Sequence, residues 1–169
     1  MKFSEDVLQV TMARYLAKVE AQGIHPMTYA ADQNAARRGR TAGPLAKLMG
    51  MRRGETDLRI YLPEGRLISI EVKKATGRMS TDQLARHQQL EDLGFTAVTI
   101  WASSPPDAVY ALRAALREQG VDWAGEATST LAQNASDEVL EALGIKNDTG
   151  GLAKLADNGQ LSSSSGDTE

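Results

Sequence analysis

Two alternating stretches on either side of a tight turn constrain the fold of this chain more than any other feature. Apolar and polar residues alternate over 57–62 (DLRIYL) and again over 68–74 (ISIEVKK), and Pro63-Glu64-Gly65 lies in the turn between them. A period of two is typical of a β-strand with one buried face, and two such strands around a short Gly-containing turn predict a β-hairpin.

The length of the turn determines which residues of the hairpin lie opposite each other. If the turn has three residues, Leu62 pairs with Arg66, and Asp57 lies directly opposite Glu71 with a Cβ–Cβ distance of about 4.5–5.5 Å. Lys73 follows Glu71 by two residues and therefore shares its face of the sheet. A turn one residue longer or shorter would break this pairing. The residues expected to face the core are Leu58, Ile60, Ile68, Ile70 and Val72.

Two facing carboxylates repel each other, so a positive group is needed to make this arrangement favourable. Mg²⁺ is such a group, because it takes an octahedral set of oxygens, typically from one or two carboxylates, waters and a substrate phosphate. A metal held by Asp57 and Glu71 would polarise a phosphoryl oxygen and lower the pKa of a bound water. Lys73 would position that water or stabilise the transition state. The simpler alternative is an ordinary surface face on which Lys73 forms an ion pair worth little.

Periodicity and capping residues place further elements around the hairpin. The helix that follows it opens with a capping box, in which Ser80 is the N-cap and Gln83 is at N3. The order of elements predicts an α/β fold, a mixed sheet with helices packed on its faces. The expected helices are 4–20, 43–49, 80–94 and 105–120, and the expected strands besides the hairpin are 26–31 and 96–102.

The 169 residues are enough for one domain with its own core. The chain has no cysteine, which excludes disulfides and thiolate metal sites, and its two histidines are too few for a histidine-rich metal centre. Charged residues follow the N-terminus before any apolar run, and no apolar stretch approaches the roughly 20 residues of a membrane span. We therefore expect a cytoplasmic protein without a membrane segment.

The charge of the chain is unevenly distributed. Residues 1–117 carry 17 Lys+Arg and 12 Asp+Glu, a net charge of +5, whereas residues 118–169 carry 2 and 10, a net charge of −8. No acidic residue lies between positions 33 and 54, and such a local basic surface binds phosphates whatever the overall charge. A solvated positive loop is the equally weighted alternative. The basic residues of this stretch are Arg37, Arg38, Arg40, Lys47, Arg52 and Arg53.

Residues 1–120 are expected to form the main domain, and residues 121–169 an acidic C-terminal extension. One short helix is predicted in the extension, at about 136–143, and its Ser-rich end is predicted to be disordered. The extension either binds a protein partner or aids solubility.

The ETD segment that ends at Asp57, followed by EVK at 71–73, matches the D…(D/E)-x-K core of the PD-(D/E)XK nucleases. Further matching segments are SEDVLQ (4–9), NAARR (34–38), LAKLMGMRRGETDL (45–58) and RMSTDQ (78–83). Together they resemble the VRR-Nuc family of that superfamily over about 4–101. Thr56 stands where the family usually has proline, and the acidic extension has no counterpart.

The resemblance implies a restriction-endonuclease-like fold with an αβββαβ core and a Mg²⁺-dependent nuclease, in which Mn²⁺ would substitute. Glu5 would help a second metal or orient the first, although it also suits the positive end of its helix dipole. Gln83 would lie near the lysine, although the capping box alone explains it. We interpret His87, on the same helix, as packing. The implied catalytic residues are Asp57, Glu71, Lys73, Glu5 and Gln83, and the implied metal ligands are Asp57, Glu71, Glu5 and the carbonyl of Val72.

The resemblance also implies a DNA substrate. Small stand-alone members resemble phage enzymes that cut branched DNA such as a Holliday junction, which implies a homodimer in a bacterial or phage-infected cell. One alternative is a non-catalytic DNA-binding module on the same fold. Another is an RNA nuclease, which the scarcity of aromatic residues disfavours. The residues expected to bind the nucleic acid are Asn34, Arg37, Arg38, Arg40, Arg52 and Arg53.

Overall fold

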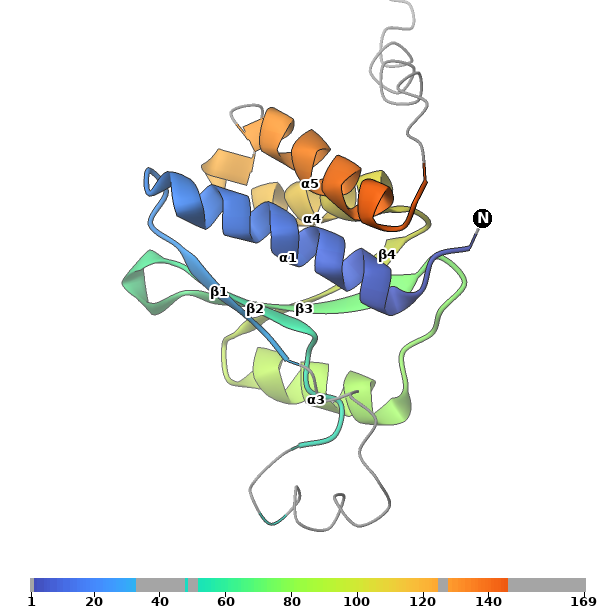
Figure 1. Cartoon of the computed structure of the whole chain (residues 1–169). Helices are drawn as coiled ribbons and strands as arrows, with labels where there is room; N and C mark the ends of the chain where they lie inside the picture. Colours follow the sequence, from blue (N-terminus) through green and yellow to red (C-terminus); the bar gives the residue numbers. More distant parts are fainter. Residues whose placement is uncertain (1, 33–47, 49–51, 125–127, 146–169) are drawn as a thin grey trace, which may run out of the picture.

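The protein is an α/β structure in which helices cover both faces of one mixed sheet (Figure 1). The computed structural model describes residues 2–32, 48, 52–124 and 128–145. Its helices are α1 (Glu5–Gln22), α3 (Thr81–Asp92), α4 (Pro105–Glu118) and α5 (Ser129–Ala142), with short 3-10 turns η1 (Pro63–Gly65) and η2 (Asp122–Ala124). Its strands are β1 (Thr28–Ala31), β2 (Leu58–Tyr61), β3 (Leu67–Lys74) and β4 (Thr96–Ala102).

The four strands lie in the order in which they occur in the chain, β1-β2-β3-β4. The pairs β1–β2 and β2–β3 are antiparallel, and β3–β4 is parallel. A parallel pair needs a crossover connection, which α3 provides. The carboxyl ends of β3 and β4 therefore meet at one edge of the sheet, next to the first turn of α3.

The hairpin has the predicted register. Leu58 pairs with Ile70 across β2 and β3, and the Leu62 N–H donates to the Arg66 carbonyl at 2.9 Å to close the turn. The turn contains two consecutive left-handed residues, Glu64 (φ 63°) and Gly65 (φ 73°), and the second suits glycine because it has no Cβ. The three-residue turn and the register of the hairpin are confirmed, and Asp57 lies one residue before the first paired residue of β2.

The core lies between the sheet and helices α1 and α4, on the upper face of the sheet in Figure 1, and α5 packs on these two helices. The aliphatic face of the hairpin supplies one side of this core, as predicted, and α1 and α4 supply much of the other. Helix α3 covers the opposite face of the sheet. The buried hairpin residues are Leu58, Ile60, Ile68, Ile70 and Val72.

Helix α5 begins seven residues before the predicted start at Ser136. Its buried face is made largely of small residues, including Ala132 and Ala135, which leave little apolar periodicity in the sequence. The packed core therefore continues past residue 120, where we expected the main domain to give way to an extension. Tyr15 in α1 joins this region through a 2.7 Å hydrogen bond between its hydroxyl and that of Thr128.

Two further predictions fall largely on residues outside the described ranges. Of the predicted helix at 43–49 only Leu48 is described, and it is helical. The predicted disordered end of the chain lies beyond Ile145, the last described residue. Among the described helices, none is long and apolar enough to cross a bilayer.

We expect a chain that ends at Gly120 to lose its cooperative thermal transition or to unfold at a much lower temperature, because truncation exposes the core surface that α5 and η2 cover. A chain that ends at Ile145 keeps these elements and is the matched control. Circular dichroism melting curves of both chains test this expectation. Equal melting temperatures would show that α5 contributes nothing to stability. The buried side chains lost at Gly120 include Val121, Ala124, Ala132, Ala135, Val139 and Leu140.

Candidate active site

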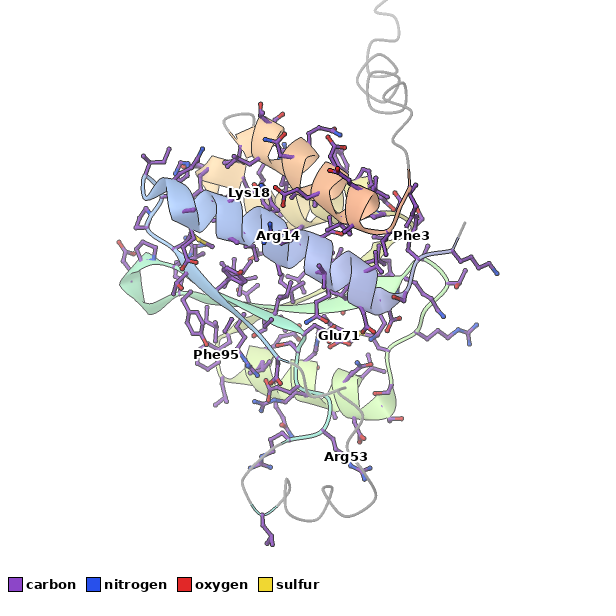
Figure 2. All side chains as sticks on the ribbon, viewed as in Figure 1. Phe3, Arg14, Lys18, Arg53, Glu71 and Phe95 are labelled. Carbon is purple, nitrogen blue, oxygen red and sulfur yellow. The ribbon has the colours of Figure 1, made fainter. Side chains whose placement is uncertain are left out.

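The face of β3 that carries Glu71 and Lys73 is buried beneath α3. The side chain of Glu71 is 0% exposed and that of Lys73 is 8% exposed. Figure 2 shows Glu71 between the sheet and α3. Lys73 Nζ lies 2.5 Å from Glu71 Oε1. The alternative of an ordinary surface face is therefore wrong, although the ion pair that it invoked is present.

Asp57 immediately precedes β2 and is fixed by hydrogen bonds to both its side chain and its backbone. Its Oδ2 accepts from the Val72 N–H at 2.7 Å. Because the backbone pairing of β2 begins at Leu58, this carboxylate takes the place of a strand acceptor. The Asp57 carbonyl accepts from Gln9 Nε2 in α1 at 3.0 Å and from the Asp32 N–H after β1 at 2.8 Å.

Gln83 completes the capping box and also contacts the buried carboxylate. Its Oε1 accepts from the Ser80 N–H at 2.8 Å, and the Ser80 hydroxyl accepts from the Gln83 N–H at 3.2 Å, which completes the capping box. Its Nε2 donates to Glu71 Oε1. The N-terminus of α3 is thus hydrogen-bonded to the buried carboxylate of β3.

Glu5 reaches the same site from the first turn of α1. Its Oε2 lies 3.7 Å from Lys73 Nζ, and its Oε1 accepts from the Lys74 N–H at 3.3 Å. The loop after β3 passes close by, because a Cβ on Gly77 would lie 2.9 Å from Glu5 Oε1. Glu5 therefore does more than complement its helix dipole. The structure brings together Glu5, Asp57, Glu71, Lys73 and Gln83.

Two carboxylates of this site, those of Glu71 and Asp57, have a raised pKa in the metal-free protein. Burial raises the pKa of Glu71 to about 7, and the charges of Asp57 and Glu5 add to the effect of burial while Lys73 opposes it. Burial also raises the pKa of Asp57, against the hydrogen bond from Val72. Burial would lower the pKa of Lys73, but the hydrogen bond and charge of Glu71 outweigh it and the pKa is raised.

The donor set fits a hard divalent cation. Glu71 Oε2 is buried and has no hydrogen-bond partner among the described residues, which leaves one carboxylate oxygen available inside the site. Within the described part of the chain, no three His, Asp or Glu side chains form a ready-made metal cluster. Mg²⁺ does not require one, because it is usually held by one or two carboxylates with waters and substrate phosphates. The Val72 carbonyl, the other implied ligand, is 3.4 Å from Lys73 Nζ.

A second ionic group fixes the segment before Asp57, and sequence reasoning missed it. Glu55 Oε1 lies 2.6 Å from Arg59 Nη2, and Glu55 Oε2 lies 2.9 Å from Arg86 Nη2 on α3. Arg59 also lies 3.4 Å from Asp32. Burial raises the pKa of Glu55, but the two arginines outweigh it and the pKa is lowered. Nothing in the sequence signals either pair, because a spacing of four brings side chains together in a helix and not in an extended segment, and Arg86 is 31 positions from Glu55.

The remaining predicted residues divide between described and undescribed parts of the chain. Arg52 and Arg53 are exposed, and Arg53 Nη1 lies 3.8 Å from Asp82 Oδ2 at the start of α3 (Figure 2). His87 is buried, as its interpretation as packing requires, and burial lowers its pKa. The other predicted nucleic-acid contacts lie outside the described residues: Asn34, Arg37, Arg38 and Arg40.

Comparison of the chain with protein-family models, curated proteins and solved structures finds no match.

We expect Gly54→Ala to destabilise the protein more than Gly65→Ala. Both glycines have φ of +73°, so both substitutions carry the left-handed penalty of about 1–3 kcal/mol. An added Cβ at Gly54 would also lie 2.3 Å from the Asp82 carbonyl oxygen, whereas at Gly65 it meets nothing within 4 Å. Urea denaturation of both variants measures the difference. Equal losses of unfolding free energy would show that Gly54 is not packed against α3.

The metal-free protein should lose stability as the pH rises from about 4.5 to about 7. The pKa of Glu71 is about 7 in the folded state and about 4.5 in the unfolded chain, so the folded state binds the proton more tightly. Its contribution is complete below pH 4.5 and is lost as the pH rises through 7. Urea denaturation in EDTA should show this loss, roughly 1–3 kcal/mol, in the wild type and not in Glu71→Gln. Parallel pH profiles of the two proteins would contradict the expected titration.

Proposed function

We propose that this protein is a Mg²⁺-dependent endonuclease that hydrolyses phosphodiester bonds in DNA, and that the sheet and α3 form the core of a restriction-endonuclease-like fold. The observation that carries the proposal is the buried Glu71 carboxylate, whose Oε2 has no partner in the described part of the chain and which lies beside Asp57, Glu5 and Lys73. The element order α1-β1-β2-β3-α3-β4 supports the αβββαβ core that the motif resemblance implies.

The side chains of the site have two kinds of role: the carboxylates bind a cation, and Lys73 stabilises negative charge. Asp57, Glu71 and Glu5 supply the oxygen ligands, with the Val72 carbonyl as a further one. Bound Mg²⁺, or Mn²⁺ in its place, would lower the pKa of a water and polarise the phosphoryl oxygen. Lys73 then orients the water or stabilises negative charge on the phosphate, as a preorganised cation in a desolvated site does. Gln83 acts by holding Glu71 in position.

Branched or duplex DNA is the substrate that we propose, with a Holliday junction as one form. Arg52 and Arg53 would contact the phosphate backbone, and they lie in the segment that leads into Glu55 and Asp57. A homodimer would present two such sites to the two cut strands. The proposed setting is the cytoplasm of a bacterial or phage-infected cell, and we propose the acidic residues beyond 120 as a site for a protein partner.

A non-catalytic DNA-binding module is the second candidate. The direct contact between Lys73 and Glu71 favours it, because the two groups neutralise each other without a metal. A catalytic site differs from such a module in one testable respect. If the site is catalytic, adding Mg²⁺ must lead to hydrolysis of the bound DNA and not only change the affinity of the protein for DNA.

We expect the wild type to cut four-way-junction or duplex DNA in Mg²⁺ and not in EDTA. Lys73→Ala should lower the single-turnover cleavage rate by about 100-fold or more, the usual loss when one stabilising group is removed from a transition state. Lys74→Ala is the matched control, because this neighbouring lysine is exposed and touches Glu5 only through its backbone N–H. Gel analysis of labelled DNA measures both rates.

Binding without cutting in both Mg²⁺ and Mn²⁺ would instead support the non-catalytic module. Equal cutting by the wild type and Lys73→Ala would leave a nuclease whose chemistry lies elsewhere. Faster cleavage of the matching RNA than of DNA would reassign the substrate.

A further inference from the structure

Trp101 is a half-exposed aromatic side chain next to Lys73. The two residues are register partners on the parallel strands β3 and β4, and neighbouring strands lie about 4.8 Å apart, so their side chains leave the same face of the sheet side by side. Lys73 is buried, whereas Trp101 is 49% exposed. Strand β4 is an edge strand, so no further strand of the described sheet covers the outer side of Trp101.

The indole of Trp101 is held in one orientation. Its Nε1–H donates to the Gly77 carbonyl at 3.2 Å. Gly77 lies against Glu5, because a Cβ added there would come within 2.9 Å of Glu5 Oε1 and 3.4 Å of Lys73 Cβ. One loop therefore contacts both the carboxylate site and the edge of the indole. A side chain fixed in this way loses little conformational entropy when a ligand packs against it.

Trp123, the second tryptophan of the chain, has a structural role and serves as a comparison for Trp101. Trp123 is partly buried against the core, and its ring stacks on His25 with 5.8 Å between ring centroids. No ring contact of this kind involves Trp101 among the described residues. One cation lies on the Gly77 loop, Arg78. It is exposed and forms no ion pair with another described residue.

We propose that Trp101 stacks on a nucleobase that is unstacked from its neighbour, beside the phosphate on which Lys73 acts. This inference rests on the proposed function and narrows its substrate. Inside a continuous duplex each base is covered on both faces, so an indole can stack only where the duplex is interrupted. A flap, a branch point or a single-stranded end provides such a base, and Arg78 would contact its phosphates.

The test compares a continuous duplex with the same duplex carrying a single-stranded flap, with Ca²⁺ replacing Mg²⁺ and affinity measured by fluorescence anisotropy of labelled DNA. Trp101→Ala should weaken flap binding by about tenfold and leave duplex binding unchanged, because stacking is lost from one base only. Trp101→Phe keeps an aromatic face and should retain most of the affinity. Tyr110→Ala, at an exposed aromatic on α4, is the matched control and should bind both DNAs normally.

Tryptophan fluorescence supplies a second readout. If Trp101 had only a structural role, its emission would not change when DNA binds. Flap DNA should quench the emission of the wild type, and Trp101→Phe, which retains only Trp123, should show no quenching. Flap binding by Trp101→Ala at wild-type affinity, or equal losses for flap and duplex, would overturn the inference. If the wild type cuts DNA in these cases, the proposed function survives. If the wild type neither binds nor cuts either DNA, both proposals fail.

Discussion

The buried carboxylate of Glu71 is the feature on which the arrangement of the other site residues depends. Burying a charge costs several kcal/mol unless hydrogen bonds and an opposite charge compensate for it. Lys73 of the same strand and Gln83 of α3 both donate to one oxygen, Oε1, while Oε2 has no partner among the described residues. The site is thus incompletely compensated. The raised pKa of Glu71 reflects this incomplete compensation, and a bound cation would stabilise the charged carboxylate.

Local patterns in the sequence were sufficient to predict the hairpin and its register. A three-residue turn and a period of two involve only neighbouring residues, so they determine which residues of β2 and β3 pair without knowledge of the rest of the fold. The capping box at Ser80 is equally local. The same patterns could not reveal that α3 buries the polar face of β3. They also could not reveal that Asp57 accepts a hydrogen bond from the Val72 N–H, because this contact depends on where the pairing of β2 ends.

The packing of the C-terminal region could not be predicted from composition, because an acidic segment of low apolar periodicity is typical of a solvated extension. Helix α5 buries small residues such as Ala132, Ala135 and Ser136, which fit between α1 and α4 without producing an apolar stripe in the sequence. Part of its negative charge has a structural role. Glu138 forms ion pairs with Arg14 and Lys18 of α1, which lower its pKa (Figure 2). Part of the opposite charge of the N-terminal and C-terminal regions therefore lies in ion pairs between α1 and α5.

The parallel pairing of β3 with β4 brings the polar groups of the candidate site to one end of the sheet, where the carboxyl ends of both strands lie. In open α/β sheets ligands bind outside the carboxyl ends of the strands, and here Lys73 and Lys74 at the end of β3 pair with Trp101 and Ala102 at the end of β4. The crossover that a parallel pair requires also places the N-terminus of α3, with Gln83, at this end. An antiparallel β4 would have moved its last residues to the opposite end, away from Lys73. One topological choice thus places a buried carboxylate, a lysine, a helix terminus and an exposed indole at the same end of the sheet.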